Sequence, residues 1–265
     1  MGTNYHGSQW QPEVRTVQGE IIDAVSRWSD ETHSVETVQL AGRTDREVHA
    51  FGQIALIKSQ RELELDQINR FLPDDISLWA HRRAPDSFMP RFSVLARHYR
   101  YYHPNPYREL NIGTIRKGIQ YLIGSHDFAL ISKPDGDRNT DATILNASVQ
   151  ERDQMLVFEF YGTRFLWKLV RKSVSLLLDI GLGMYEPEVV RELLLQRHTA
   201  SGIEPAPPEG LVLVESIYPI LMERCKNAIF RIRKYLREQK SWFGRMYATY
   251  QGVNDDFLSD QKFLF

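Results

Sequence analysis

The sequence predicts an α+β protein whose strands form an antiparallel sheet. Segments with helical periodicity are interleaved with strand-like segments at hairpin spacing, and they do not follow a regular strand–helix–strand alternation. The chain has 265 residues, of which 42% are hydrophobic and 11% aromatic, so it can bury one large core or two smaller ones. The two halves have similar element content, which is compatible with a pair of related α/β sandwiches.

The first half is expected to open with a loop over residues 1–12, followed by an amphipathic helix at about 16–29 in which apolar residues recur from Val17 to Trp28. The alternating and β-branched segments predict strands at 35–40, 52–58, 76–81 and 92–103. A short helix at 66–71 should stop before Pro73. The turn Pro104-Asn105-Pro106 is the expected boundary between a first domain, 1–103, and a second, 104–265.

The second half is expected to contain four helices and three strands. Helices are predicted at about 112–123, 164–180, 187–196 and 224–240, and the first of them should end at Gly124. Strands are predicted at about 143–151, 155–160 and 211–217. The helix over 224–240 is strongly basic, and its end is weakly defined by the sequence.

Composition excludes several kinds of site. Cys225 is the only cysteine, so an intrachain disulfide or a multi-cysteine zinc site cannot form. Neither a glycine-rich phosphate loop nor a histidine pair at metal-ligand spacing occurs, so we expect no metal and no cofactor. No apolar run approaches the roughly 18 residues that span a membrane, and we expect a soluble, cytoplasmic protein.

The net charge is −1, but the basic residues are clustered. They gather at 81–83, at 91–100 and along 224–240. A neutral total with basic stripes is compatible with nucleic-acid binding along one face. The alternative is that these arginines and lysines simply lie on solvent-exposed faces and bind no partner.

The segment 41–55 is the strongest candidate for a site, because it places Gly, Arg, Thr, Asp and His in a short polar loop that leads directly into a strand. Asp45 lies two residues from Arg43, whose positive charge would keep a partly desolvated carboxylate ionised for use as a nucleophile or base. The alternative is a turn in which Thr44 and Asp45 make only local hydrogen bonds.

Two residues elsewhere extend this candidate site. Arg171 interrupts an apolar helix and needs either a buried acidic partner, for which Asp45 is suitable, or a route for its side chain to the surface. Tyr99 and Tyr101 share one face of a predicted strand beside several arginines. Such tyrosines either pack within the sheet or stack on an unpaired nucleobase.

The ordered motifs resemble those of the TruA family of tRNA pseudouridine synthases, with a tail more similar to that of the archaeal branch. The central match is Gly42-Arg43-Thr44-Asp45 with Val48-His49-Ala50 and Gly52-Gln53. Further motifs match in order over most of the chain: Asn4-Tyr5-His6-Gly7, Leu72-Pro73-Asp74-Asp75-Ile76, Arg91-Phe92-Ser93, Ala96-Arg97-His98-Tyr99-Arg100-Tyr101, Gly124-Ser125-His126-Asp127-Phe128, Phe165, Leu169-Val170-Arg171, Gly181-Leu182-Gly183 and Pro208-Glu209-Gly210-Leu211.

The resemblance implies two ferredoxin-like halves that share an extended antiparallel sheet with a central cleft. It also implies a homodimer that docks the anticodon arm of tRNA and isomerises uridine to pseudouridine at tRNA positions 38 to 40, without metal or organic cofactor. Carried over by position, Asp45 corresponds to the catalytic aspartate, Tyr99 to the active-site tyrosine and Arg171 to the partner of the aspartate. Arg43 would assist base flipping, and Arg91, Arg97 and Arg100 would contact RNA.

One departure from the family pattern bears on activity. Glu47 occupies a position where the family has glycine, and a glutamate resists the positive φ that glycine adopts easily. The chain also starts where the family has a complete first strand. These differences motivate the alternative of a catalytically inactive tRNA-binding or RNA-binding relative, and a weaker one is an interaction domain with no RNA role.

Overall fold

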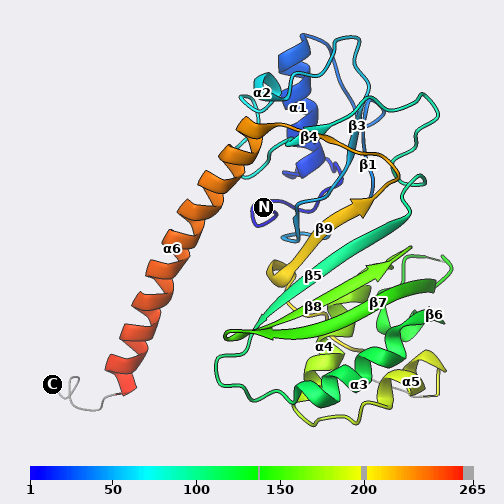
Figure 1. Ribbon diagram of the computed structural model, residues 1–265, viewed down its shortest axis with the longest axis vertical. Helices are drawn as coiled ribbons and strands as arrows, with labels where there is room; N and C mark the ends of the chain where they lie inside the picture. Colours follow the sequence, from blue (N-terminus) through cyan, green and yellow to red (C-terminus); the bar gives the residue numbers. More distant parts are fainter. Residues whose placement is uncertain (137, 198–201, 259–265) are drawn as a thin grey trace.

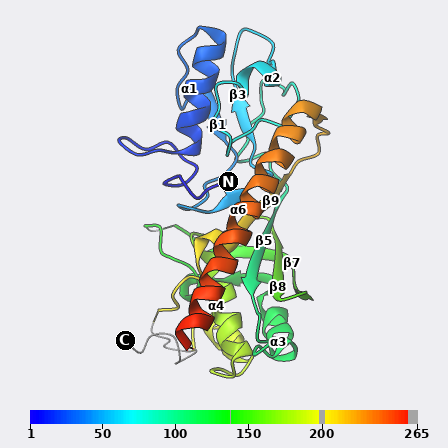
Figure 2. The same cartoon turned by 90° about the vertical axis from the view of Figure 1, so that its left-hand side faces the viewer.

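The computed structural model describes residues 1–136, 138–197 and 202–258. The molecule is elongated, with a small assembly built from the N-terminal residues at one end and a large sheet carrying helices at the other (Figure 1). A long C-terminal helix starts beside the small assembly and runs along the molecule toward the far end (Figures 1 and 2).

A six-stranded sheet forms the centre of the fold, in the order β2-β9-β5-β8-β7-β6. The strands are β2 (His49–Ala50), β5 (Ala96–Pro104), β6 (Gly124–Asp127), β7 (Asp141–Arg152), β8 (Met155–Gly162) and β9 (Leu211–Ile217). All neighbours are antiparallel except β2 and β9, which pair in parallel. The sheet is therefore mixed, and the expectation of a wholly antiparallel sheet was wrong at this edge, where the chain leaving the Asp45 loop enters beside β9 in the same direction.

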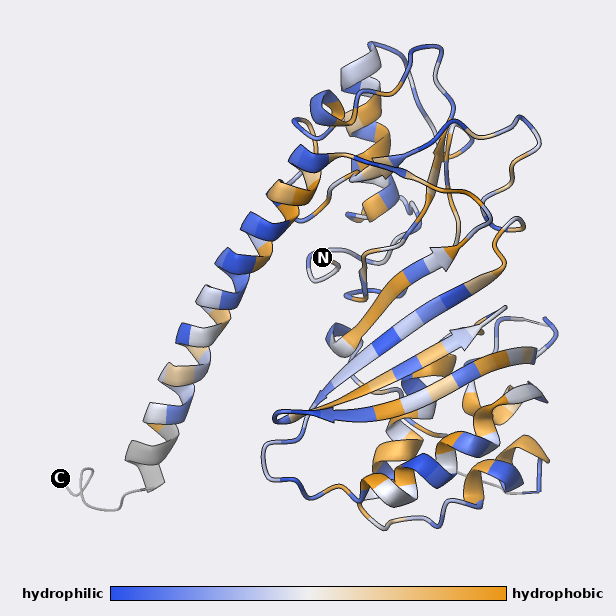
Figure 3. Cartoon of the chain, in the orientation of Figure 1, coloured by the Kyte–Doolittle hydropathy of each residue, from blue (hydrophilic) through white to orange (hydrophobic). Residues whose placement is uncertain are grey.

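Three helices cover one face of this sheet: α3 (Ile112–Leu122), α4 (Leu169–Gly181) and α5 (Val189–Leu194). Their apolar sides meet β5, β7, β8 and β9 in the larger of two hydrophobic cores. Figure 3 shows hydrophobic residues concentrated along β9 and in α4. Helix α4 begins later than the predicted residue 164, because Lys168 has a φ of 61° and this left-handed residue stops the helix from extending toward the N-terminus.

The smaller core belongs to the first eighty residues. It packs α1 (Val17–Ser29) and α2 (Leu65–Ile68) against the hairpin-like pair β1 (Val38–Leu40) and β3 (Ala55–Ile57). Thr16 accepts a hydrogen bond from the backbone of Gly19 and so caps α1 at the predicted position. The predicted strand 52–58 is shorter, because the backbone of Gly52 is hydrogen-bonded to Leu213 and Ser216 of β9 and does not pair with β1.

The remaining strand pair connects the end of the smaller N-terminal assembly with the segment that leads into the C-terminal helix. β4 (Ala80–His81) pairs with β10 (Glu223–Arg224), immediately before α6 (Lys226–Leu258). Helix α6 has 33 residues and continues well past the predicted end at residue 240. Within the ranges given above, the structure contains no helix that is both long and apolar enough to cross a membrane.

Candidate active site

The loop that carries Asp45 is fastened to the first residues of the chain. Ser8 donates its backbone N–H to the Thr44 carbonyl at 3.1 Å, and the Ser8 hydroxyl accepts the Thr44 N–H at 2.8 Å. Gly7 permits this close approach, because it has a φ of 98° and an added Cβ would lie 2.8 Å from the Thr44 carbonyl oxygen. The loop therefore has a fixed main-chain path before Asp45.

Glu47 adopts a left-handed backbone conformation of the kind that glycine adopts easily. Its φ is 67°, and the turn closes with a 3.2 Å hydrogen bond from the Val48 N–H to the Asp45 carbonyl. The Glu47 N–H donates to the Tyr5 carbonyl at 3.2 Å, and the Glu47 carboxylate accepts from Arg46 at 2.9 Å. The glutamate thus preserves the loop geometry at a conformational cost of roughly 1–2 kcal/mol.

Replacing Glu47 with glycine should raise the free energy of unfolding by up to about 1 kcal/mol, because glycine adopts a positive φ without steric cost. The gain is limited by the larger conformational entropy of glycine in the unfolded chain. Chemical denaturation of the two proteins measures the difference, and Glu47→Ala serves as a control that keeps the strain. Equal or lower stability of the glycine variant would contradict the assignment of strain.

Asp45 and Arg171 meet at the edge of the larger core. The Arg171 Nη1 atom lies 3.3 Å from Asp45 Oδ2, and the two side chains are 10% and 26% exposed. Arg171 also donates a hydrogen bond from Nε to the Ala206 carbonyl at 2.6 Å. The Ala206 N–H in turn donates a 3.1 Å hydrogen bond to the Arg171 carbonyl. The guanidinium is held from two sides, and within the described residues Asp45 Oδ1 has no hydrogen-bond partner.

Tyr99 borders this ion pair on β5. Its ring is buried and packs edge-on against Phe165, with the ring centroids 5.0 Å apart. Burial raises the pKa of Tyr99 to about 12, the charge of Asp45 acts in the same direction, and Arg97 opposes it. The phenol therefore stays protonated at neutral pH. Tyr101, two residues further on, is 2% exposed and belongs to the core.

The four predicted RNA-binding arginines occupy different environments. Arg43 and Arg91 are exposed. Arg97 donates to the Ala41 carbonyl at 2.9 Å and to the Thr163 carbonyl at 3.3 Å, so it ties the Asp45 loop to the end of β8. Arg100 lies on the opposite face of β5 from Tyr99 and forms a 2.6 Å ion pair with Glu159. The structure thus brings together Asp45, Arg171 and Tyr99, with Arg97 beside their loop.

Sequence reasoning did not assign roles to three of the residues that build this site. Phe165 belongs to one of the family motifs and Ser8 directly follows another, which was the only signal for these two residues. Ala206 acts through its carbonyl oxygen in the proline-rich segment 205–208 and has no polar side chain. Main-chain contacts of this kind cannot be predicted from the amino-acid type at the position.

A carboxylate held by a buried arginine beside a protonated tyrosine, within a mixed α+β fold, is compatible with an enzyme that uses an aspartate as nucleophile or base. Comparison with known proteins narrows this class. Residues 119–219 match the family model described as tRNA pseudouridine synthase. Proteins named tRNA pseudouridine synthase A are similar over most of their length.

The relative from Archaeoglobus fulgidus is 35% identical over 218 residues, which cover 82% of this chain and 80% of the relative. The protein from Pyrococcus furiosus is 33% identical over 264 residues, covering 98% and 96% respectively. The protein from Methanocorpusculum labreanum is 37% identical over 218 residues, covering 80% and 74%. The chain belongs to the tRNA pseudouridine synthase family.

Proposed function

We propose that the protein isomerises uridine to pseudouridine in the anticodon arm of tRNA, at positions 38 to 40. The observation that carries this proposal is the Asp45–Arg171 ion pair, which orients one carboxylate oxygen and leaves the other free. Membership of the family and the names of the similar proteins support tRNA as the substrate. Asp45, Arg171 and Tyr99 are the proposed catalytic residues.

In the proposed reaction the C1′–N1 glycosidic bond breaks and a C1′–C5 bond forms. The free oxygen of Asp45 either attacks C1′ or removes the 2′ proton, and both routes release the uracil ring with its electron pair on N1. After the ring turns, C5 bonds to C1′ while the Asp45–C1′ ester bond breaks or, on the other route, while C2′ regains its proton from Asp45. The proton on C5 is then lost and N1 gains one, so the product is an isomer of the substrate and Asp45 is a free carboxylate again. In this proposal the detached base stacks on Tyr99, which keeps the base in place, although only 8% of Tyr99 is exposed in the free protein.

The exposed arginines fit the handling of RNA around this step. A stacked uridine must leave the stem before its glycosidic bond can be reached, which costs roughly a few kcal/mol. Arg43 is exposed two residues from Asp45 and is suited to fill the space that the base leaves. Arg91 and Arg100 would contact phosphates, and Arg97 would both hold the Asp45 loop and contact RNA.

The architecture that goes with this function is also a proposal. The order β5-α3-β7-β8-α4-β9, with the strands arranged β9-β5-β8-β7, follows the βαββαβ pattern and supports a ferredoxin-like second half. The smaller core supports a separate first half. The predicted boundary near residue 103 would assign β5 to the first half, whereas the βαββαβ pattern assigns it to the second and supports a boundary before Ala96. A ferredoxin-like first half, a cleft between the halves, a homodimer and a cytoplasmic location remain predictions.

Incubation with an unmodified tRNA that has uridines at positions 38 to 40, followed by mapping of pseudouridine, tests the proposal. We expect pseudouridine at these positions with the wild-type protein and none with Asp45→Asn. Pseudouridine only at other positions would refute the anticodon-arm assignment. Absence of product from the wild-type protein would refute the activity itself. The alternative of a catalytically inactive relative is not favoured, because Glu47 has the positive φ that a glycine at this position would adopt easily.

A further inference from the structure

Helix α6 has a net positive charge, although the whole chain has a net charge of −1. Its residues 226–258 contain seven lysine or arginine residues and three acidic residues, a balance of +4. The remainder of the chain therefore carries −5. This separation of charge makes α6 the part of the molecule most attractive to a polyanion.

The basic residues of α6 form one continuous stripe. Lys226, Arg233, Arg237 and Lys240 follow one another at spacings of seven, four and three residues, which places them on one side of the helix. Phe230 and Tyr247 share this spacing and are 67% and 64% exposed. We refer to these six residues as the basic stripe.

The basic stripe points away from the body of the protein. Ala228, on the other side of the helix, is 2% exposed and packs against the body, while Arg233, Arg237 and Lys240 are exposed. Within the part of the chain that the structure describes, these three cations make no ion pair with an acidic side chain. Their charges are therefore available to a partner.

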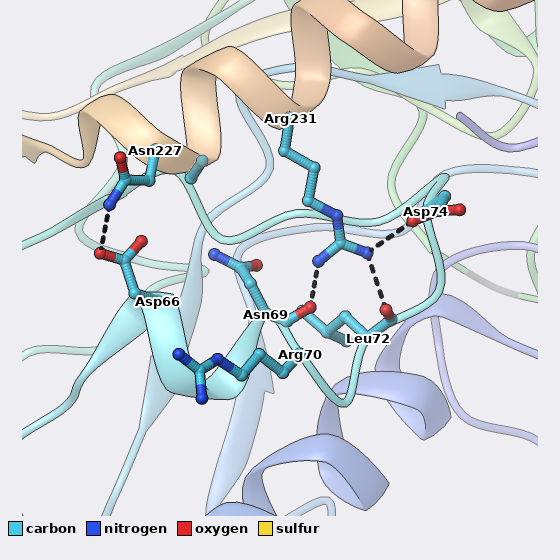
Figure 4. Close-up of a pocket in the computed structure, with 8 residues that line it drawn as sticks. Asp66, Asn69, Arg70, Leu72, Asp74, Asn227 and Arg231 are labelled. Carbon is cyan, nitrogen blue, oxygen red and sulfur yellow. Dashed lines mark hydrogen bonds and ion pairs between the residues drawn. The ribbon is translucent and has the colours of Figure 1, made fainter.

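The start of α6 is anchored firmly enough to act as a rigid support. Arg231 donates to the carbonyl oxygens of Asn69, Leu72 and Pro73 and to the Asp74 carboxylate. Asp66 accepts hydrogen bonds from Cys225 and Asn227 at 3.0 and 2.8 Å. A pocket of about 400 Å³ lies between α2 and the first turns of α6. Figure 4 shows Asp66, Asn227 and Arg231 among the residues that line it.

We propose that the basic stripe of α6 binds the phosphate backbone of the tRNA substrate, at a site separate from the Asp45 loop. A 33-residue helix is about 50 Å long, so a stripe on it can reach RNA well beyond the modified uridine. Arginine and lysine neutralise phosphates, and the exposed aromatic rings in the stripe can stack on unpaired bases. The choice of tRNA as the RNA rests on the proposed function.

A second copy of the chain is the competing occupant of α6. It would pack against the opposite, apolar side of the helix, where Trp242 and Tyr250 are 48% and 70% exposed. That arrangement leaves the positive charges of the basic stripe without a partner. The charge distribution favours RNA, and the test below includes the oligomeric state.

The test compares the full-length wild-type protein with the variant Arg233→Gln/Arg237→Gln/Lys240→Gln. A matched control, Arg116→Gln/Lys117→Gln/Arg191→Gln, removes three exposed charges from α3 and α5. We measure the Kd for an unmodified tRNA over a range of salt concentrations, the steady-state constants and the mass in solution. Removing the stripe should weaken binding by about ten- to a hundredfold and reduce the slope of log K against log salt by about three. KM should rise while kcat stays unchanged.

Equal affinity of the α6 variant and the control would overturn the proposal, and so would a loss of affinity that accompanies a change in solution mass. The two proposals can fail separately. If the wild-type protein forms no pseudouridine but its tRNA binding still depends on the basic stripe, the catalytic proposal fails alone. If it forms pseudouridine and the α6 variant keeps the wild-type KM, the α6 proposal fails alone.

Discussion

The variant Asp45→Asn is expected to form pseudouridine at least about a thousandfold more slowly than the wild-type protein, because an amide can neither attack C1′ effectively nor accept the 2′ proton. Asparagine has nearly the same shape, and the loop is held mainly through the backbone bonds to Ser8 and Tyr5. Fold and tRNA affinity should therefore change little. Single-turnover release of tritium from C5 of labelled uridine in tRNA measures the rate directly.

A second carboxylate serves as the control for this substitution. Asp23 is exposed on α1, and Asp23→Asn should leave the rate unchanged. Thermal melts of all three proteins show whether any loss of rate comes from unfolding. If Asp45→Asn retains a rate within tenfold of wild type, Asp45 is not the catalytic group.

The variant Arg171→Met is expected to reduce kcat by about a hundred- to a thousandfold, a loss comparable to removing one preorganised electrostatic contact from an active site. Methionine keeps much of the apolar contact, but Asp45 loses its cationic partner and the Ala206 carbonyl loses its donor. Leaving a buried acceptor without a partner costs about 1–3 kcal/mol, so the free energy of unfolding should fall as well.

Arg171→Lys separates the role of charge from that of geometry. A lysine ammonium retains the charge but cannot match the two contacts that Nε and Nη1 make in different directions. We expect an intermediate kcat for this variant and a greater stability than that of Arg171→Met. Arg108→Met, which removes an arginine from the exposed pair with Glu151, is the control. A full kcat for Arg171→Met would exclude a role for the ion pair in catalysis.

Much of the fold could be predicted because it follows from local periodicity. Helices α1 and α3 lie close to their predicted positions, since apolar spacing and caps such as Thr16 and Asn111 are properties of neighbouring residues. The parallel pairing of β2 with β9 was missed, because it joins segments more than 150 residues apart and depends on their tertiary approach. The late start of α4 was missed because it depends on the left-handed backbone at Lys168.

The candidate site was likewise predictable only in part. Asp45 and Arg171 could be paired in advance, because an arginine in an apolar helix requires an acidic partner or access to water. The sequence alone did not exclude that the Arg171 side chain reaches water. Only the 3.3 Å contact between the two side chains in the structure places them together. Glu47 is the opposite case: its residue type argues against a positive φ, whereas surrounding contacts such as the backbone bond to Tyr5 hold it there.

The bond from Arg171 to the Ala206 carbonyl has a consequence for how this family can change over time. Any residue that tolerates burial at position 206 has the same carbonyl oxygen, so substitutions there should change the contact with Arg171 little. Pro205 and Pro207 restrict the main chain on either side and fix the direction of that oxygen. An insertion or deletion in this segment would move it away from the guanidinium. The two flanking prolines and the length of the segment between Gly202 and Gly210, rather than the side chain at position 206, therefore keep this oxygen beside the guanidinium.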